Sequence, residues 1–476
     1  MIRKIAEDIS KELLSKNSRQ RKLQGNRLDN LIMSVEKLIR DSVSIRFSRS
    51  RMNLASIRKR PAAYTKGRYN SRLSYRIHVQ LAYEGMCRLG YLEEVKAGVS
   101  HGSLGLYLTR YKSTAKLIRC FKEVELATLP VIAGLEPIDE TIRVQIKEPE
   151  WNAKLSKMGT RKRLIEYTDT DETQVMRNNL SRINQAISSR WIDLELSDDG
   201  FVVMQSLMRP RKNRHNADDR QLNLTKTQLY RVFNDPEFKT GGRFYGGWWQ
   251  NIPKQFRHLI TINGKRTIEA DFSSFHPSIL YARKQIEPPQ DAYSDILPNL
   301  PRDVAKTAFN AMINAEEPTL AQPRGMKLST YSYRWQDVVK AMFVRHSAIK
   351  DAFFSGAGKY LQRIDSDLAE RTMLSFMDYA TPVTILPVHD SFIMHHGYQS
   401  ELAQFMQAHF HEMFGFNINI GLEYGVHGPS PLITASTDVD ELLDNVTGAE
   451  KRLGAWHSLN QPISSSFKIA KCLLRE

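Results

Sequence analysis

Two apolar segments, about 120 residues apart, each carry one aspartate where a strand is expected to end. In TIEADFSSFHPSILYARK, residues 267–272 favour a strand and Pro277 precedes an apolar run with helical spacing, so Asp271 is expected where the strand passes into a turn. In TPVTILPVHDSFIMHHG, two apolar runs flank residues 389–391, a pattern typical of a β-hairpin with Asp390 at its tip. Bringing both acids to one place predicts an α+β fold with a small antiparallel sheet.

Two carboxylates held together in this way suit a divalent metal site. Mg²⁺ prefers oxygen ligands, so the backbone carbonyl of Phe272 is expected to join Asp271 and Asp390. A pair of Mg²⁺ ions about 4 Å apart, or Mn²⁺ in their place, would activate an attacking 3′-hydroxyl and stabilise the leaving phosphates. The pattern therefore indicates phosphoryl transfer.

A cationic helix is expected between the two aspartates, in PRDVAKTAFNAMINA. Arg302 and Lys306 are four residues apart, so they lie one turn apart on one helix face. Two cations placed in this way can bind the triphosphate of a nucleotide and neutralise charge on the leaving pyrophosphate. The alternative is an ordinary surface helix.

The positive charge is concentrated at the N-terminus. Residues 1–120 contain 26 Lys and Arg against 9 Asp and Glu, a net +17, so the rest of the chain carries about −1 of the total of +16. Amphipathic helices in residues 1–60, a helix over 72–88 and two extended segments after Gly90 resemble a winged helix. We therefore expect residues 1–125 to form a basic helical or winged-helix domain that binds nucleic acid; a generic solvated basic face is the alternative.

The remaining chain divides at loop-like segments. Residues 127–150 are rich in loop signals, and a helix is expected after the TDTDET cluster with Asp169 or Thr170 as its cap. This predicts a helical, thumb-like connector over 126–235, a catalytic unit over 236–425 and a C-terminal extension of unknown role over 426–476. No apolar run approaches the roughly 18 residues of a membrane span, and the three cysteines lie far apart, which favours a cytoplasmic protein with reduced thiols.

Five motifs occur in an order that resembles family A DNA polymerases and the related phage-type RNA polymerases. They are GGRFYGGWWQNIP, ADFSSFHPSILYA, RDVAKTAFNAMINA, YLQRIDSDLAERTM and PVHDSF, within residues 241–396. The resemblance implies a right-hand polymerase, with Asp271 and Asp390 as the metal ligands of the palm and Arg302 with Lys306 on reduced fingers. The spacing from Asp271 to Arg302 is only 31 residues, and that from Arg302 to Asp390 is 88.

The same resemblance implies contacts to nucleic acid. Arg243 would contact the primer-template minor groove, and Gln250 with Asn251 match the turn that supports it. Gln362 matches a glutamine that touches the template-primer region, and His389 lies near the primer terminus in the family.

Three positions of the implied nucleotide pocket depart from the family pattern. His276 stands where family A DNA polymerases usually carry a glutamate, while Asn310 and Asn314 replace the aromatic residues expected on the fingers helix. The usual barrier to a 2′-hydroxyl is therefore missing, and the HDSF form is similar to that of phage-type RNA polymerases.

These features predict a template-directed DNA polymerase without proofreading. An RNA polymerase or primase with the same palm is the nearest alternative, and a DNA-binding replication or regulatory protein with an inactive palm is an alternative of another class. The expected partners are a DNA or RNA primer-template, nucleoside triphosphates and accessory replication proteins, without a membrane. A bacterial host, phage or plasmid setting would suit such an enzyme.

Overall fold

The structure is a computed structural model of the 476-residue chain. It describes residues 2–16, 23–47, 54–70, 72–98, 108–120, 140–152, 157–208, 222, 224, 226–318, 321–379 and 383–424. The expected C-terminal extension over 426–476 lies outside these residues. The described part of the chain is a mixed α+β fold with two separate hydrophobic cores.

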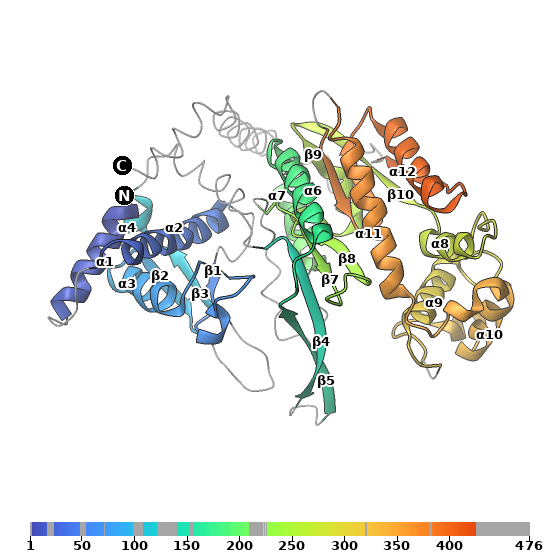
Figure 1. The fold of residues 1–476 in the computed structure, drawn as a ribbon, viewed down its shortest axis with the longest axis horizontal. Helices are drawn as coiled ribbons and strands as arrows, with labels where there is room; N and C mark the ends of the chain where they lie inside the picture. Colours follow the sequence, from blue (N-terminus) through green and yellow to red (C-terminus); the bar gives the residue numbers. More distant parts are fainter. Residues whose placement is uncertain are drawn as a thin grey trace.

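Residues 2–118 build the first core (Figure 1). Its elements are α1 (Ile2–Lys16), α2 (Asn26–Phe47), β1 (Ala55–Ile57), η1 (Pro61–Tyr64), η2 (Tyr75–Tyr83), α3 (Glu84–Arg88), β2 (Leu92–Lys96), β3 (Thr109–Ser113) and α4 (Ala115–Ile118). The three strands form an antiparallel sheet in the order β1-β3-β2, against which α2 packs. The helix predicted over 72–88 begins at Tyr75, and its first nine residues are a π-helix. A helix followed by a hairpin is thus present, and the nucleic-acid role stays a prediction.

The second core is larger and spans residues 142–418. Its elements are β4 (Ile142–Asn152), β5 (Lys157–Ile165), α6 (Asp171–Ser188), β6 (Ile192–Leu194), α7 (Asp198–Met208), β7 (Tyr230–Phe233), β8 (Gly241–Tyr245), η5 (Trp248–Asn251), η6 (Lys254–Leu259), β9 (Ile260–Ile262), β10 (Lys265–Phe272), α8 (Phe275–Arg283), α9 (Arg302–Asn314), η7 (Leu328–Tyr331), α10 (Trp335–Arg345), η8 (Ser347–Ala352), α11 (Gly358–Ser375), β11 (Ile385–Val388), β12 (Ser391–His395), α12 (Gln399–Phe414) and β13 (Ile420–Tyr424).

The connector predicted to be helical over 126–235 contains a long β-hairpin as well as two helices. Strands β4 and β5 pair antiparallel from Val144–Ile165 to Asn152–Lys157, and β4, β7 and β8 continue the sheet in the order β5-β4-β7-β8. The expectation of a loop over 127–150 was therefore wrong from residue 142 onward. Loop signals such as Pro149 misled the prediction, because proline is tolerated in a strand that has an open edge.

The helix α6 begins as its sequence predicts. The Thr170 side chain accepts a hydrogen bond from the backbone N–H of Thr173, whose hydroxyl in turn accepts one from the Thr170 N–H. This reciprocal capping satisfies two N–H groups that have no partner inside the helix. Asp169, the other candidate cap, binds Arg68 and Arg177 instead.

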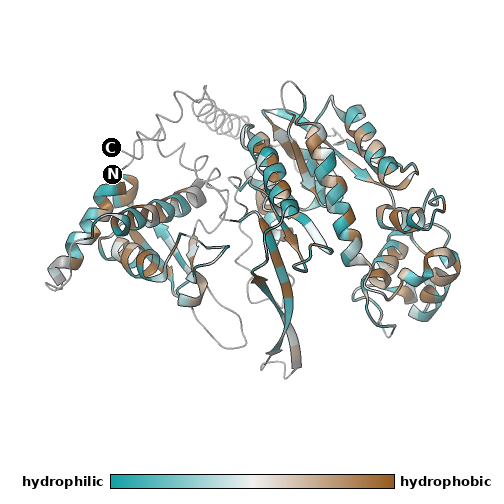
Figure 2. Cartoon of the chain, viewed as in Figure 1, coloured by the Kyte–Doolittle hydropathy of each residue, from teal (hydrophilic) through white to brown (hydrophobic). Residues whose placement is uncertain are grey.

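A six-stranded antiparallel sheet supports the segments that carry the two aspartates. Its order is β11-β12-β10-β9-β6, and β13 pairs with β10 beyond the end of β9. Helix α12 packs on β10 and on α11, which also contacts β8 and α6. These helices are apolar on one side and polar on the other, as their burial against the sheet requires (Figure 2).

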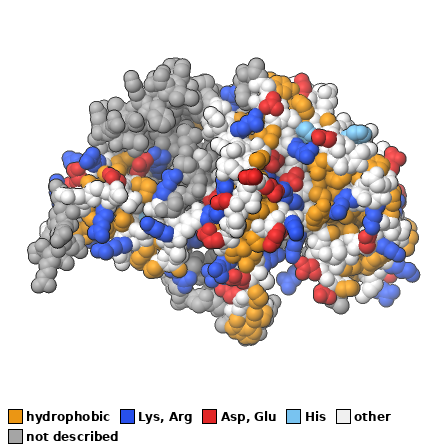
Figure 3. Space-filling view, in the orientation of Figure 1, with side chains coloured by type: hydrophobic (Ala, Val, Ile, Leu, Met, Phe, Trp, Pro, Cys, Tyr) orange, Lys and Arg blue, Asp and Glu red, His pale blue; other side chains and the backbone are white. Residues whose placement is uncertain are grey.

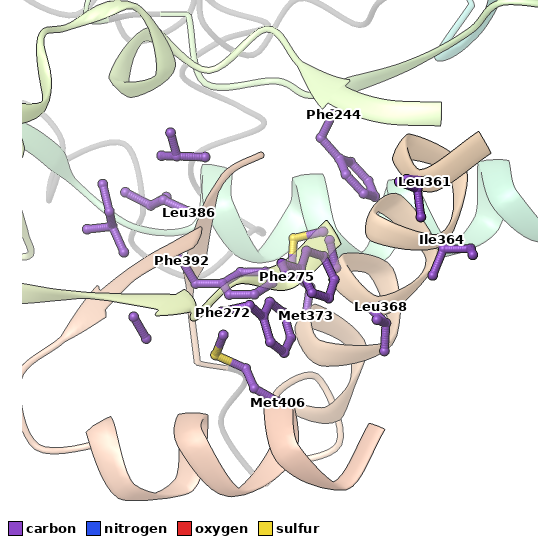
Figure 4. Close-up of a cluster of buried hydrophobic side chains, with 14 of the residues drawn as sticks. Phe244, Phe272, Phe275, Leu361, Ile364, Leu368, Met373, Leu386, Phe392 and Met406 are labelled. Atoms are coloured by element: carbon purple, nitrogen blue, oxygen red, sulfur yellow. The ribbon is translucent and has the colours of Figure 1, made fainter. Parts of the chain in front are cut away.

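The core beneath this sheet is rich in aromatic side chains. The rings of Phe272 and Phe275 stack with centroids 4.3 Å apart, and Phe392 and Met406 lie beside them (Figure 4). All four side chains are buried. Phe272 is next to Asp271 in the chain, and Phe392 is two residues after Asp390. The burial of these two rings therefore holds the backbone at both aspartates in place.

Arg68 joins the two cores. Its guanidinium lies 2.9 Å from Asp169 and 3.2 Å from the buried carboxylate of Glu140, and it stacks on Tyr167. These contacts hold the first unit against the start of the second. No helix in the described part of the chain is long and apolar enough to cross a membrane.

Candidate active site

Asp271 and Asp390 are brought together by strand pairing. Asp271 is the last residue but one of β10, and its Cα partner across the ladder is Ser391, the first residue of β12. Asp390 directly precedes Ser391 in the two-residue turn between β11 and β12. His389 occupies this turn with φ of 59°, a left-handed conformation that lets the chain reverse tightly. The hairpin predicted from the sequence is confirmed.

The pKa of Asp271 is raised by its burial and by a neighbouring acid. Its pKa is raised from 3.8 to about 7, first by burial and then by the negative charge of Asp390, while Lys306 and Lys254 act in the opposite direction. Its Oδ1 atom is buried without a hydrogen-bond partner among the described residues. An oxygen in this state is suited to a cation, which would replace the missing partner and offset the repulsion between the carboxylates.

The tip of the hairpin is tied to β10 by a buried network that the sequence did not reveal. The Ser391 hydroxyl donates to Glu269 Oε1 at 2.6 Å, and the Arg257 guanidinium lies 2.8 Å from the same oxygen. Glu269 and Asp271 are two residues apart in one strand, so both point to the same face of the sheet. The acid at position 269, inside an apolar strand, was the available signal.

Arg243 lies close enough to Asp390 to interact with its charge, but it is already paired. Its guanidinium binds the carboxylate of Asp365 on α11 at 2.6 Å, and the Asp365 side chain is only 1% exposed. Burial raises the pKa of Asp365 to about 7, and the negative charge of Asp390 adds to this effect against the pull of Arg243. Asp365 was not predicted, because an acid in a helical run gives no sign of which strand it faces.

The two cations predicted on α9 lie in different surroundings. Arg302 lies 2.7 Å from Asp291 and stacks on the ring of Tyr293, so its charge is balanced locally. Lys306 is exposed and lies near enough to Asp271 to lower the pKa of that carboxyl. The ion pair with Asp291 must open before Arg302 can bind an anion with its full hydrogen-bonding capacity.

His276 lies within the electrostatic field of the site. Burial lowers its pKa from 6.5 to about 4, and the positive charge of Arg243 lowers it further, whereas Asp390 raises it. The imidazole is therefore neutral at pH 7, and its Nε2 atom is buried with no partner in the part of the chain that the structure describes. On α9, Asn314 donates to the backbone carbonyl of Asn310, so its amide group caps its own helix.

The other predicted contact residues frame the hairpin. Gln250 donates to the carbonyls of Phe244 and Pro387, and the Trp249 indole donates to the same Pro387 oxygen at 3.1 Å. These bonds fasten the QNIP turn to β11.

The remaining predicted residues lie at the edges of the site. Asn251 is exposed and bonds weakly to Gly247, Gln362 is half-buried on α11, and the exposed His389 meets the ring of Tyr245 edge-on. Trp248 and Trp249 are buried in the core and are not available to stack on a base.

The donor set for a metal is small. Among the described residues no three His, Cys, Asp or Glu side chains are grouped to hold an ion. A metal at this place therefore depends on Asp271, Asp390 and a backbone carbonyl such as that of Phe272, with the remaining ligands from water and phosphate, as Mg²⁺ commonly has.

Comparisons with known proteins add little. No family model matches the chain, and no curated protein matches its sequence. Among solved structures, the POL domain of Pol1 from M. smegmatis in complex with DNA primer-template and dNTP is similar with a TM-score of 0.29 and 13% identity, over 47% of this chain and 49% of that one. The chain thus spans about half the length of that structure, and a likeness this weak carries no argument about activity.

Proposed function

We propose that this chain is a template-directed DNA polymerase that adds nucleotides to a primer 3′-hydroxyl by phosphoryl transfer, without proofreading. The observation that carries the proposal is the pair of acids Asp271 and Asp390, which lie on a paired strand and on the adjoining hairpin tip. The positive charge of Lys306 also acts on Asp271 and lowers its pKa. Taken with the order of the five motifs, this arrangement favours a polymerase palm over an unrelated acidic pair.

The residues present fit a divalent metal. Asp271 has a buried oxygen without a partner in the described chain and a pKa raised by the neighbouring carboxylate, both of which a cation would relieve. We propose that Asp271, Asp390 and the Phe272 carbonyl hold Mg²⁺, in two ions, or Mn²⁺. Such ions supply activation of the attacking hydroxyl and charge neutralisation at the leaving phosphates.

The chain's own residues would bind and orient the reactants. Lys306, exposed at the side of Asp271, would bind the triphosphate, and Arg302 would join it on leaving Asp291. Arg243, held rigidly by Asp365, would donate to the minor groove at the end of the primer. A side chain held in this way loses little entropy on binding, which favours accurate placement.

The nucleotide pocket supports a second candidate. His276 is neutral and half-buried, and it stands where the resemblance predicts the glutamate of a DNA polymerase. Asn310 and Asn314 leave no aromatic ring on the same helix. An RNA polymerase or primase of the same palm class is therefore the alternative, and the sugar of the nucleotide is the property that separates the two.

Primer extension tests these proposals. The purified chain is given a primed DNA template with deoxynucleoside or ribonucleoside triphosphates, each with and without Mg²⁺. Extension with the deoxy forms only supports the DNA polymerase, and extension with the ribo forms supports the alternative. No extension on several DNA and RNA templates would leave the inactive, DNA-binding protein as the better reading.

Two variants make the test specific. Asp390→Asn is expected to lower the extension rate by at least 10³-fold, on the order of the loss seen when one interaction that acts in the transition state is removed. Asp378→Asn removes an exposed carboxylate that pairs only with Arg182 among the described residues, and it should extend at the parent rate. Equal rates for Asp390→Asn and the parent would reject the site.

A further inference from the structure

The β4–β5 hairpin extends beyond the sheet to which it belongs. Only residues 142–144 of β4 pair with β7, whereas β4 and β5 pair with each other as far as Asn152 and Lys157. Residues 145–152 and 157–164 therefore form a two-stranded arm roughly 26 Å long, at about 3.3 Å per residue. Figure 1 shows this arm projecting from the molecule, between the first unit and α9.

One face of the arm is neutralised by ion pairs. Directly opposed residues share a face, so Glu148, Arg161 and Arg163 lie together with Glu150. Arg163 lies 3.1 Å from Glu148, and Arg161 lies 3.7 Å from Glu150. The charges of these four side chains therefore cancel.

The other face combines an apolar end with two lysines. Trp151 and Met158 are directly opposed at the end of the arm and are 57% and 58% exposed. Figure 3 shows a patch of hydrophobic side chains at the tip of the arm. Lys147 and Lys162 are also directly opposed, are exposed, and form no ion pair with a described residue. Like charges at such a position destabilise a strand pair, so the chain retains an unfavourable feature that an anionic partner would relieve.

The positive charge of Lys147 also reaches a residue near the end of α9. After Lys359, Lys147 contributes to lowering the pKa of Glu316, which lies two residues beyond the end of α9.

We propose that this face of the β4–β5 arm binds duplex nucleic acid, with Lys147 and Lys162 on the phosphates and Trp151 with Met158 against a base step. A two-stranded ribbon can enter a groove of a duplex, and proteins that bind the minor groove insert apolar side chains between base steps. The exposed apolar area is too small for a stable protein interface, which buries about 800 Å² on each side. Pro149 in the open part of β4 also disfavours the addition of a strand from another protein.

The proposal deepens the polymerase function by assigning a second contact to the primer-template, and binding experiments test it without catalysis. Fluorescence anisotropy of a labelled primer-template duplex is measured with full-length protein in EDTA, over a series of salt concentrations. The test variants are Lys147→Gln/Lys162→Gln and Trp151→Ala. The matched control, Arg161→Gln/Arg163→Gln, changes the net charge equally on the opposite face. Circular dichroism confirms that each variant is folded.

The two test variants are expected to differ in kind. Loss of both lysines reduces the slope of log affinity against log salt by about 2, at roughly 0.9 for each phosphate contact. Loss of the indole weakens binding by about 10-fold at every salt concentration, and Trp151→Phe restores most of the affinity. The control variant shows smaller changes in both quantities.

Three outcomes would overturn the proposal: parent-like binding by both test variants, equal effects of the test and control pairs, or Trp151-dependent binding to vesicles of anionic phospholipid without any to the duplex. Primer extension in parallel separates this proposal from the proposed function. If the protein extends primers but the arm variants bind the duplex like the parent, the proposal about the arm is rejected and the proposed function stands. If binding depends on the arm but no primer is extended, the proposed function is rejected and the proposal about the arm stands.

Discussion

Replacing Asp271 by asparagine should make the metal-free protein less sensitive to pH. The folded pKa of Asp271 is about 7, whereas the ordinary value is 3.8. Between these values the folded protein keeps a proton that the unfolded chain has released, so the stability of the parent falls as the pH rises from about 4 to about 7. Asparagine does not titrate, so the Asp271→Asn variant lacks this loss.

The size of the effect follows from the same two values. A shift of one pKa unit corresponds to about 1.4 kcal/mol, so the difference between the two pKa values lowers the free energy of unfolding by at most about 4 kcal/mol. About 3 kcal/mol of this loss falls between pH 5 and pH 8. Asp271 is partly exposed, so solvent screening reduces the second figure to about 1.5 kcal/mol. Between pH 5 and pH 8, the free energy of unfolding of the variant should therefore rise by about 1.5 kcal/mol relative to that of the parent.

Urea unfolding followed by tryptophan emission measures the difference. Five of the six tryptophans lie within the second unit and the sixth, Trp456, lies outside the described residues, so the emission reports chiefly on the second unit. In EDTA the curves of parent and Asp271→Asn should diverge toward pH 8, and Mg²⁺ should then stabilise the parent alone, because it binds only the folded site. Parallel pH curves, or equal stabilisation of both proteins by Mg²⁺, would refute the assignment of Asp271. Asp378→Asn should behave as the parent throughout.

Three further substitutions test other parts of the structure. Arg243→Ala leaves the buried Asp365 carboxylate unpaired and should destabilise the second unit by about 3 kcal/mol at pH 8 and by less at pH 5, where Asp365 is protonated; urea unfolding that shows the same loss at both pH values would contradict this. Lys306→Ala should raise KM for the nucleoside triphosphate about 10-fold in steady-state extension, and an unchanged KM would exclude it from triphosphate binding. Arg68→Ala removes the contact with Glu140 and should separate the unfolding of the two units in calorimetry, whereas one unchanged transition would show that other contacts join them.

Features set by neighbouring residues could be predicted from the sequence. The cap at Thr170 depends on residues within one turn, and the hairpin that displays Asp390 depends on two flanking apolar runs. The position of Asp271 near the end of a strand follows from the alternation before it and the helix after it. In each case the physical signal lies within about ten residues, where periodicity and turn chemistry decide the conformation.

Pairings between distant segments could not be predicted. Asp365 and Arg243 are 122 residues apart, and nothing in either segment identifies the other. The ion pair between Asp291 and Arg302 was not expected, because the sequence does not indicate where the loop that contains Asp291 lies in the fold. The β4–β5 arm was missed because its proline and charged residues are typical of loops, although an open two-stranded ribbon tolerates both.

The sequence by itself determined which residues we propose for the chemistry: two aspartates, one near a strand end and one at a hairpin tip, a cationic helix between them and a basic N-terminal region. Only the tertiary structure decided how these groups act on one another. Ladder register puts Asp390 beside Asp271, and the raised pKa of Asp271 results from burial and repulsion that exist only in the folded chain. Register and burial depend on the simultaneous packing of segments far apart in sequence, which no local pattern encodes.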